Sequence, residues 1–174
     1  GITPGARVNI DSIFDDKGKL YIWGGNSRGV TDQAMYIFDT FDSTWSRILP
    51  SYVPEQRMAY SVTFKDGKIY FIGSTFSNIQ DQKCVDIREI WIYDTLNTNN
   101  NPWTKKNAIN TTYISNRYAH AAALAPSNQS IILYGGIISN ASGIPPDYLI
   151  TLDLQTFELS KLVTKHEPNI EDVS

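Results

Sequence analysis

The chain has few of the residues that build most catalytic and metal centres. Its 174 residues include one cysteine, Cys84, and two histidines, His120 and His166. A lone cysteine excludes an internal disulfide, and no Cys/His spacing resembles a zinc site. Phosphate-binding glycine loops, nucleophile elbows and metalloprotease helices are also missing. We therefore predict no catalytic residue, no metal and no cofactor.

Long apolar runs and clustered charge are missing as well. No stretch of 18 apolar residues occurs, so we expect no membrane span. The net charge is −3 and the charged residues are scattered singly. Nucleic-acid-binding proteins carry a basic patch or stripe, so nucleic acid is not an expected partner.

The compartment stays open between the cytoplasm and an extracellular segment of a secreted or membrane-anchored protein. No signal-peptide pattern begins the chain. Three glycosylation sequons start at Asn110, Asn128 and Asn140, all in expected loops. Chance gives about as many in a chain this rich in Asn, Ser and Thr, so the sequence does not decide whether they are glycosylated.

Two short blocks recur three times in the same order. The first is an apolar strand that ends in glycine, at 20–25, 69–73 and 131–136. The second is a strand that ends in aspartate, at 35–40, 90–95 and 149–154. An arginine precedes each pair of blocks, and an aromatic residue follows it: Arg7, Arg57 and Arg117, then Trp45, Trp103 and Phe157. Repeats of this length indicate a repeat architecture.

A period of roughly 50 residues with a diglycine and a late Trp is the kelch signature. The chain resembles the kelch-repeat β-propeller family, in its fungal-type form, over about residues 7–162. It departs from the family pattern at Ser74, which replaces the second glycine, and at Phe157, where the family prefers Trp. Ile10 stands where the third copy has His120.

The resemblance implies an all-β fold of three four-stranded kelch-type blades in a single domain, 1–174. The blades are expected at about 7–49, 57–106 and 117–162, with 163–174 as a tail or the start of a next blade. Strands are expected near 7–14, 19–23, 35–39, 44–48, 58–64, 68–72, 90–94, 102–106, 117–124, 130–134, 148–153 and 157–162, with no helix longer than two turns. The four tryptophans, Trp23, Trp45, Trp91 and Trp103, are expected to be largely buried between blades.

Three blades are too few to close a ring, because propellers have about 4–8. Terminal repeats need polar caps, and the first copy, with Trp23 and Trp45, does not have the sequence of a cap. The chain is therefore expected either to form a homodimer or to be part of a larger propeller.

Recognition is expected on one face, because long loops on a rigid scaffold carry binding residues more often than short ones. The loops between second and third strands, 26–34, 74–89 and 137–147, share that side with the connections 49–56 and 107–116. The candidate binding residues on this face are Arg28, Tyr52, Arg57, Phe76, Lys83, Arg88, Tyr113, Arg117 and Tyr118. For Arg57 and Arg117, which recur at each blade start, a structural role is the alternative. His120 is read as a hydrogen-bonded interior histidine, with a ligand role as the alternative.

The expected function is non-catalytic protein–protein recognition. The first alternative is part of an oxidoreductase-like kelch-propeller enzyme completed by missing blades. Galactose oxidase has this fold, but its copper site uses two tyrosines, two histidines and a cysteine cross-linked to a tyrosine, and this chain has no Tyr-His dipeptide. That resemblance is in fold only. The second alternative is a carbohydrate-binding ectodomain.

Overall fold

The computed structural model describes residues 2–26, 33–76, 83–97, 101–110, 112–139 and 145–165, and all regular structure among them is β. None of these residues forms a helix long and apolar enough to cross a membrane. The expectation of an all-β chain is confirmed: the strands form several small, mainly antiparallel sheets.

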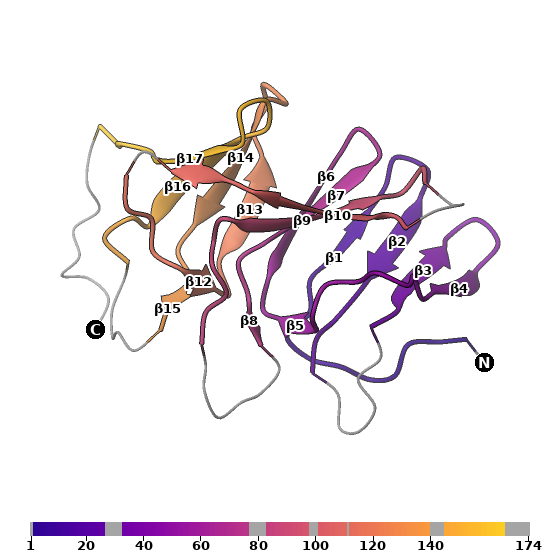
Figure 1. The fold of residues 1–174 in the computed structure, drawn as a ribbon. Helices are drawn as coiled ribbons and strands as arrows, with labels where there is room; N and C mark the ends of the chain where they lie inside the picture. The colour runs from indigo at the N-terminus through magenta and orange to yellow at the C-terminus, as the bar shows by residue number, and fades with distance from the viewer. Residues whose placement is uncertain are drawn as a thin grey trace.

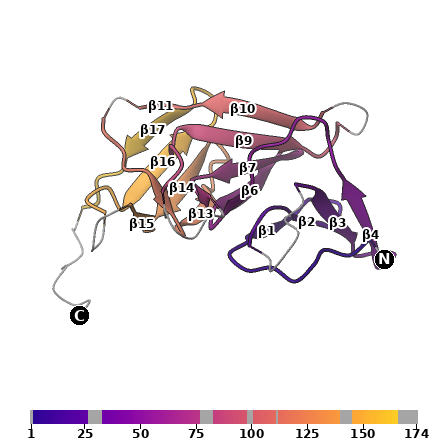
Figure 2. The ribbon, with the colours of Figure 1, turned by 60° about the horizontal axis from the view of Figure 1, so that its bottom comes forward.

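Three larger sheets follow one another along the chain and across the molecule (Figures 1 and 2). The first contains β1 (Ser12–Phe14), β2 (Lys19–Ile22), β3 (Met35–Asp39) and β4 (Thr44–Ile48). The second contains β6 (Ser61–Lys65), β7 (Lys68–Ile72), β9 (Glu89–Asp94) and β10 (Trp103–Asn107). The third contains β13 (Ala121–Leu124), β14 (Ser130–Tyr134), β16 (Leu149–Asp153) and β17 (Glu158–Lys161), with β11 (Ile109–Asn110) parallel to β17.

The predicted strands agree with these bounds except in the first strand of each repeat. There the chain adopts a left-handed conformation at Asn9, Ala59 and Ala119, with φ of 56°, 53° and 55°. A left-handed residue cannot continue a strand, so the expected spans 58–64 and 117–124 are each broken into two. The same break leaves Val8, expected within a strand over 7–14, in an isolated bridge to Asn26.

The short pieces cut off by these breaks form two small two-stranded sheets. One pairs β5 (Arg57–Met58) with β8 (Thr75–Phe76), and the other pairs β12 (Arg117–Tyr118) with β15 (Ile137–Ile138). Both lie along the lower edge of the molecule in Figure 1. Each small sheet thus joins the start of a repeat to the loop between that repeat's second and third strands. The sequence predicts that these segments lie on the same side.

The aspartates that end the third strands start turns, as expected from their short side chains. The carboxylate oxygens of Asp39, Asp94 and Asp153 each accept a hydrogen bond from the backbone N–H two residues later, at 3.0, 3.0 and 2.8 Å. Of the sequon residues, Asn110 lies in β11, which corrects its placement in a loop. Asn128 lies in a turn, and Asn140 is outside the described residues.

The third copy of the late aromatic position is Leu159, which corrects its assignment to Phe157. Leu159 pairs with Leu152 as Trp45 pairs with Phe38 and Trp103 with Tyr93. Phe157 instead occupies the left-handed turn position of Ser43, with φ of 56° against 58°. The late aromatic position is thus identified by strand pairing with the residue before the aspartate.

Two apolar clusters join the sheets. Between the first and second sheets, Trp103 contacts Trp23, Phe71 and Tyr93 at ring-centroid distances of 5.1, 5.1 and 5.0 Å. Between the second and third sheets the contacts are aliphatic and include Ile72, Ile90, Leu133, Leu152 and Leu159.

Three of the four tryptophans, Trp23, Trp91 and Trp103, are buried as predicted. Trp45 is half-buried, so it is less covered in this chain than the other three. It lies beside Phe38, centroids 5.0 Å apart, on the face of the first sheet that points away from the second.

Candidate functional site

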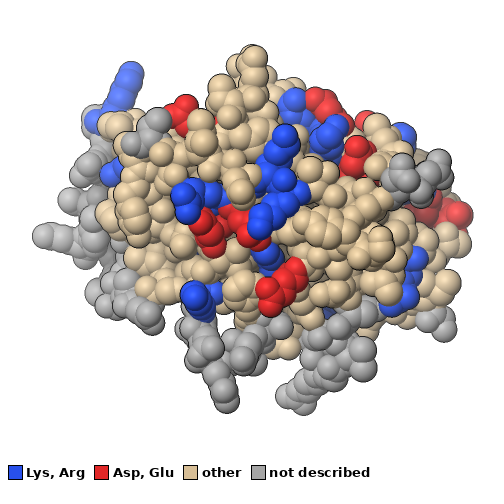
Figure 3. Space-filling model, viewed as in Figure 1, with Lys and Arg blue, Asp and Glu red and all other residues tan. Residues whose placement is uncertain are grey.

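A hollow of about 370 Å³ opens where β5, β8, β9 and β10 meet, and we call it the central groove. Its lining residues are Glu55, Arg57, Phe76, Lys83, Cys84, Val85, Asp86, Glu89, Trp91 and Lys105. Figure 3 shows Lys, Arg, Asp and Glu side chains gathered over this part of the face. The groove thus lies at the loop-bearing side expected from the sequence.

Glu89 is the electrostatic centre of the central groove. Its carboxylate accepts hydrogen bonds from Arg57, from Lys105 Nζ at 2.7 Å and from the indole Nε1 of Trp91 at 3.0 Å. Partial burial opposes ionisation of Glu89, but these three donors outweigh it and lower its pKa to about 2. The groove therefore holds a fixed anion between two cations at neutral pH.

Aromatic rings form the apolar part of the groove. The guanidinium of Arg57 lies 5.9 Å from the centroids of both Phe76 and Trp91, within the range of a cation–π contact. Tyr52 packs against Trp91 with centroids 5.5 Å apart, yet 51% of its surface stays exposed. Tyr52 thus lies at the edge of the groove, with one side of its ring against Trp91 and the rest exposed to solvent.

A second hollow, of about 550 Å³, adjoins the groove through the shared residues Lys83 and Cys84, and we call it the side hollow. Its other lining residues are Tyr113, Ser115, Asn116, Ile138 and Ser139. Tyr113 is 86% exposed. Cys84 is buried, and its backbone N–H donates to Ser139 Oγ at 2.8 Å. The two hollows make one continuous surface from Tyr52 to Tyr113.

The structure brings together Tyr52, Arg57, Phe76, Lys83 and Tyr113 from the predicted set. Arg88 points its guanidinium at Asp86, Nη2 to Oδ2 2.6 Å, beside the groove. This hydrogen bond is the main reason that the pKa of Asp86 lies below its usual value. Arg28 lies outside the described residues.

Arg117 and Tyr118 are not part of this surface. Arg117 is fully buried, and its Nη2 lies 2.7 Å from Asp147 Oδ1. Its Nη1 donates to the backbone oxygens of Gly135 and Asp147 at 3.0 and 2.9 Å, so its role is structural. Tyr118 is half-buried in β12, paired with Ile137.

His120 is an interior histidine, as the sequence suggests. Its Nε2 lies 2.8 Å from the hydroxyl of Ser61 in the second sheet. Burial, with a smaller contribution from the charge of Arg117, lowers the pKa of His120 to about 4. The ring is therefore neutral at physiological pH and links two sheets.

Sequence reasoning missed Glu55, Trp91 and Lys105 as groove residues. Trp91 is assigned to the core from the sequence, and it does lie there, but its indole N–H also reaches Glu89 in the groove. Lys105 lies on β10, directly opposite Trp91 in register. That pairing is the one signal that could have placed Lys105 beside the loop residues.

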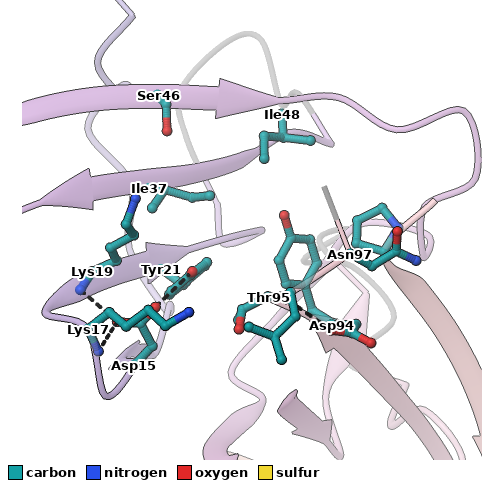
Figure 4. Close-up of a pocket in the computed structure, with 13 residues that line it drawn as sticks. Asp15, Lys17, Lys19, Tyr21, Ile37, Ser46, Ile48, Asp94, Thr95 and Asn97 are labelled. Atoms are coloured by element: carbon teal, nitrogen blue, oxygen red, sulfur yellow. Dashed lines mark hydrogen bonds between the residues drawn. The ribbon is translucent and has the colours of Figure 1, made fainter. Parts of the chain in front are cut away.

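A hollow of about 400 Å³ lies at the opposite strand ends, between the first and second sheets (Figure 4). There Asp15 accepts hydrogen bonds from the Tyr21 hydroxyl at 3.1 Å and from the backbone N–H groups of Lys17 and Lys19 at 2.9 and 2.8 Å. Both carboxylate oxygens of Asp15 thus accept hydrogen bonds from residues of the same hairpin. None of the described residues of the predicted site lines this hollow.

Across the described ranges, no group of three or more His, Cys, Asp or Glu side chains is arranged to hold a metal ion. Compared with known proteins, the chain matches neither a protein-family model nor a curated protein sequence.

Proposed function

We propose that this chain is a three-blade segment of a kelch-type β-propeller and a non-catalytic scaffold that binds a protein partner. Support for the radial arrangement comes from the left-handed residues. The N–H of Ala59 donates to the carbonyl of Asn9, and the N–H of Ala119 to that of Ala59, each at 2.7 Å. The left-handed residue of each repeat is thus hydrogen-bonded to its equivalent in the next repeat, as expected for sheets arranged around an axis.

The observation that supports recognition best is the surface from Tyr52 to Tyr113. Tyrosine gives large contact area at low entropic cost and is enriched in binding hot spots. Between the two rings lie charges already held in place by hydrogen bonds, so binding does not have to order them. Such a surface suits a polypeptide segment that carries both polar and apolar groups.

The test uses affinity capture with three forms of the chain. The wild type and a control, Phe41→Ala, are compared with the double variant Tyr113→Ala/Lys105→Ala. Phe41 is 85% exposed and lines neither hollow. We expect the same protein to be retained by the wild type and the control and lost from the double variant.

Two results would contradict the proposal. One is a partner retained equally by all three forms, which would place recognition elsewhere. The other is a tightly bound metal at near-stoichiometric amount in the purified chain, which would favour the oxidoreductase-like alternative.

A further inference from the structure

Adjacent sheets contact each other through the same register positions each time. Trp23 of the first sheet faces the second, and Ile72, its register equivalent, faces the third. Both are at most 1% exposed. The third equivalent is Tyr134, on the face of the third sheet that no other described sheet covers. Its ring lies beside that of Tyr148, with centroids 6.1 Å apart, and Tyr134 is 58% exposed.

The glycines that follow these residues show the same difference. A Cβ on Gly24 would lie 2.6 Å from the carbonyl oxygen of Arg57, and one on Gly73 would lie 2.7 Å from that of Arg117. Each glycine thus admits the backbone of the next repeat at close range. No atom of the described residues lies within 4 Å of the same point on Gly135.

The backbone hydrogen bonds that join successive repeats are also not continued beyond the third sheet in the described part of the chain. Gly25 N–H donates to the Arg57 carbonyl at 2.8 Å, and Ser74 N–H donates to the Arg117 carbonyl at 3.2 Å. Gly136 is the next donor in this series, and the described part of the chain offers it no equivalent acceptor. The corresponding carbonyl is that of Arg7, at the other end of the molecule.

The first sheet has the complementary uncovered face, the one that in the second sheet packs on a preceding sheet. Its uncovered face carries Phe14 and Trp45, the register equivalents of Phe64 and Trp103, which both pack toward the preceding sheet. Phe14 is 52% exposed and Trp45 is half-buried. The chain therefore contains both sides of an interface that it already forms twice internally.

We propose that a second copy of this chain packs its first sheet on the third sheet of the first copy. Trp45 of one copy lies against Tyr134 of the other, and the Arg7 carbonyl accepts the N–H of Gly136. The contact is head-to-tail, so two copies close into a two-fold symmetric ring with two equivalent interfaces. Six sheets then surround the axis, within the range of about 4–8 that radial assemblies use. This interface is independent of the central groove.

The occupant is a second copy because both open faces belong to the same sequence and continue an interface already present. Each open face exposes a large aromatic ring, that of Phe14 or of Tyr134, and exposed apolar surface of this kind often marks an interaction site. Other occupants, such as further repeats on a longer chain, are outcomes of the test.

The test measures mass in solution by sedimentation equilibrium. At about 100 µM we expect the wild type at twice the 19.6 kDa chain mass. Tyr134→Lys and Phe14→Lys each place an ammonium group in both interfaces, so each should weaken association at least about 100-fold. The control Phe41→Lys, outside both faces, should stay paired.

A mixture of the two variants separates this arrangement from a face-to-face pair. In a mixed ring, one interface combines an unaltered first sheet with an unaltered third sheet, and the other carries both lysines. We therefore expect a 1:1 mixture of Tyr134→Lys and Phe14→Lys to recover two-chain species that neither variant forms alone. Amide exchange at Gly136 should slow in the wild-type pair and in the mixture.

Three results would overturn the proposal. The first is a wild type that stays at one-chain mass at about 100 µM, which would assign the faces to another occupant. The second is a ladder of larger species, which would exclude the closed ring. The third is an unrestored mixture of variants whose circular dichroism matches the wild type.

Discussion

The indole rings of Trp103 and Trp23 pack at a centroid distance of 5.1 Å, and this contact joins the second sheet to the first. Trp45 holds the register position of Trp103 one sheet earlier, but no described sheet precedes it. The same residue type at the same position is thus buried in one repeat and only half-buried in another.

Trp103→Ala should therefore destabilise the separate chain more than Trp45→Ala. Removing a buried indole costs about 3–5 kcal/mol, whereas the half-buried Trp45 loses less buried area and should cost about 1–2 kcal/mol. The sequence alone predicts the larger value for Trp45. Urea unfolding followed by circular dichroism at high dilution measures both. Equal costs would contradict the assigned sheet order.

Gly73→Ala and Gly135→Ala form a matched pair. Both residues are left-handed, with φ of 58° and 72°, so both substitutions carry a strain of about 1 kcal/mol. Only at Gly73 would the new Cβ also lie 2.5 Å from His120 Cε1 and 2.7 Å from the Arg117 oxygen. We expect an additional loss of about 1–3 kcal/mol for Gly73→Ala, measured by unfolding at high dilution. A larger loss for Gly135→Ala would be inconsistent with the open third sheet.

His120 should make stability depend on acidity. Its pKa falls from 6.5 to about 4 on folding, so the unfolded chain binds the extra proton between these values. Its contribution is therefore complete above pH 6.5 and is lost as pH falls toward 4, by up to about 3 kcal/mol. Urea midpoints of the wild type and His120→Gln, compared at pH 7 and pH 5, check this. If the variant loses as much stability on acidification as the wild type, another group is responsible.

Arg117→Met should be far more harmful than Arg7→Met at the equivalent position. Arg117 is fully buried, and its loss leaves Asp147, itself 5% exposed, without its cation. Breaking such a pair costs about 3–5 kcal/mol. Arg7 is half-buried and donates to the carbonyls of Gly5 and Gly24 at 3.1 Å, which predicts about 0.5–1.5 kcal/mol. Thermal unfolding measures the two shifts, and similar values would argue against a purely structural role for Arg117.

The candidate site was only partly predictable. Loop position identified Tyr52, Phe76, Lys83 and Tyr113 because long loops stand out in any repeat. The hydrogen-bond partners of Glu89 could not be predicted from the sequence. Arg57 and Lys105 lie 32 and 16 residues away from it and come close to it only through strand pairing. Tertiary contacts likewise separated Arg117 from Arg57, although both arginines are buried and begin equivalent repeats: Arg117 pairs with Asp147, whereas Arg57 reaches Glu89 in the central groove.

The sequence by itself determined the second, third and fourth strands of each repeat and their order, because apolar runs that end in Gly or Asp specify local structure through short-range sterics and turn chemistry. It did not determine register in the third repeat. Leu159, not Phe157, takes the Trp position because Asp153 and its turn set the pairing, as Asp39 does for Trp45. Only the tertiary structure decided which equivalent faces are covered, because covering a face depends on the presence of a neighbouring sheet and not on the residues of the face itself.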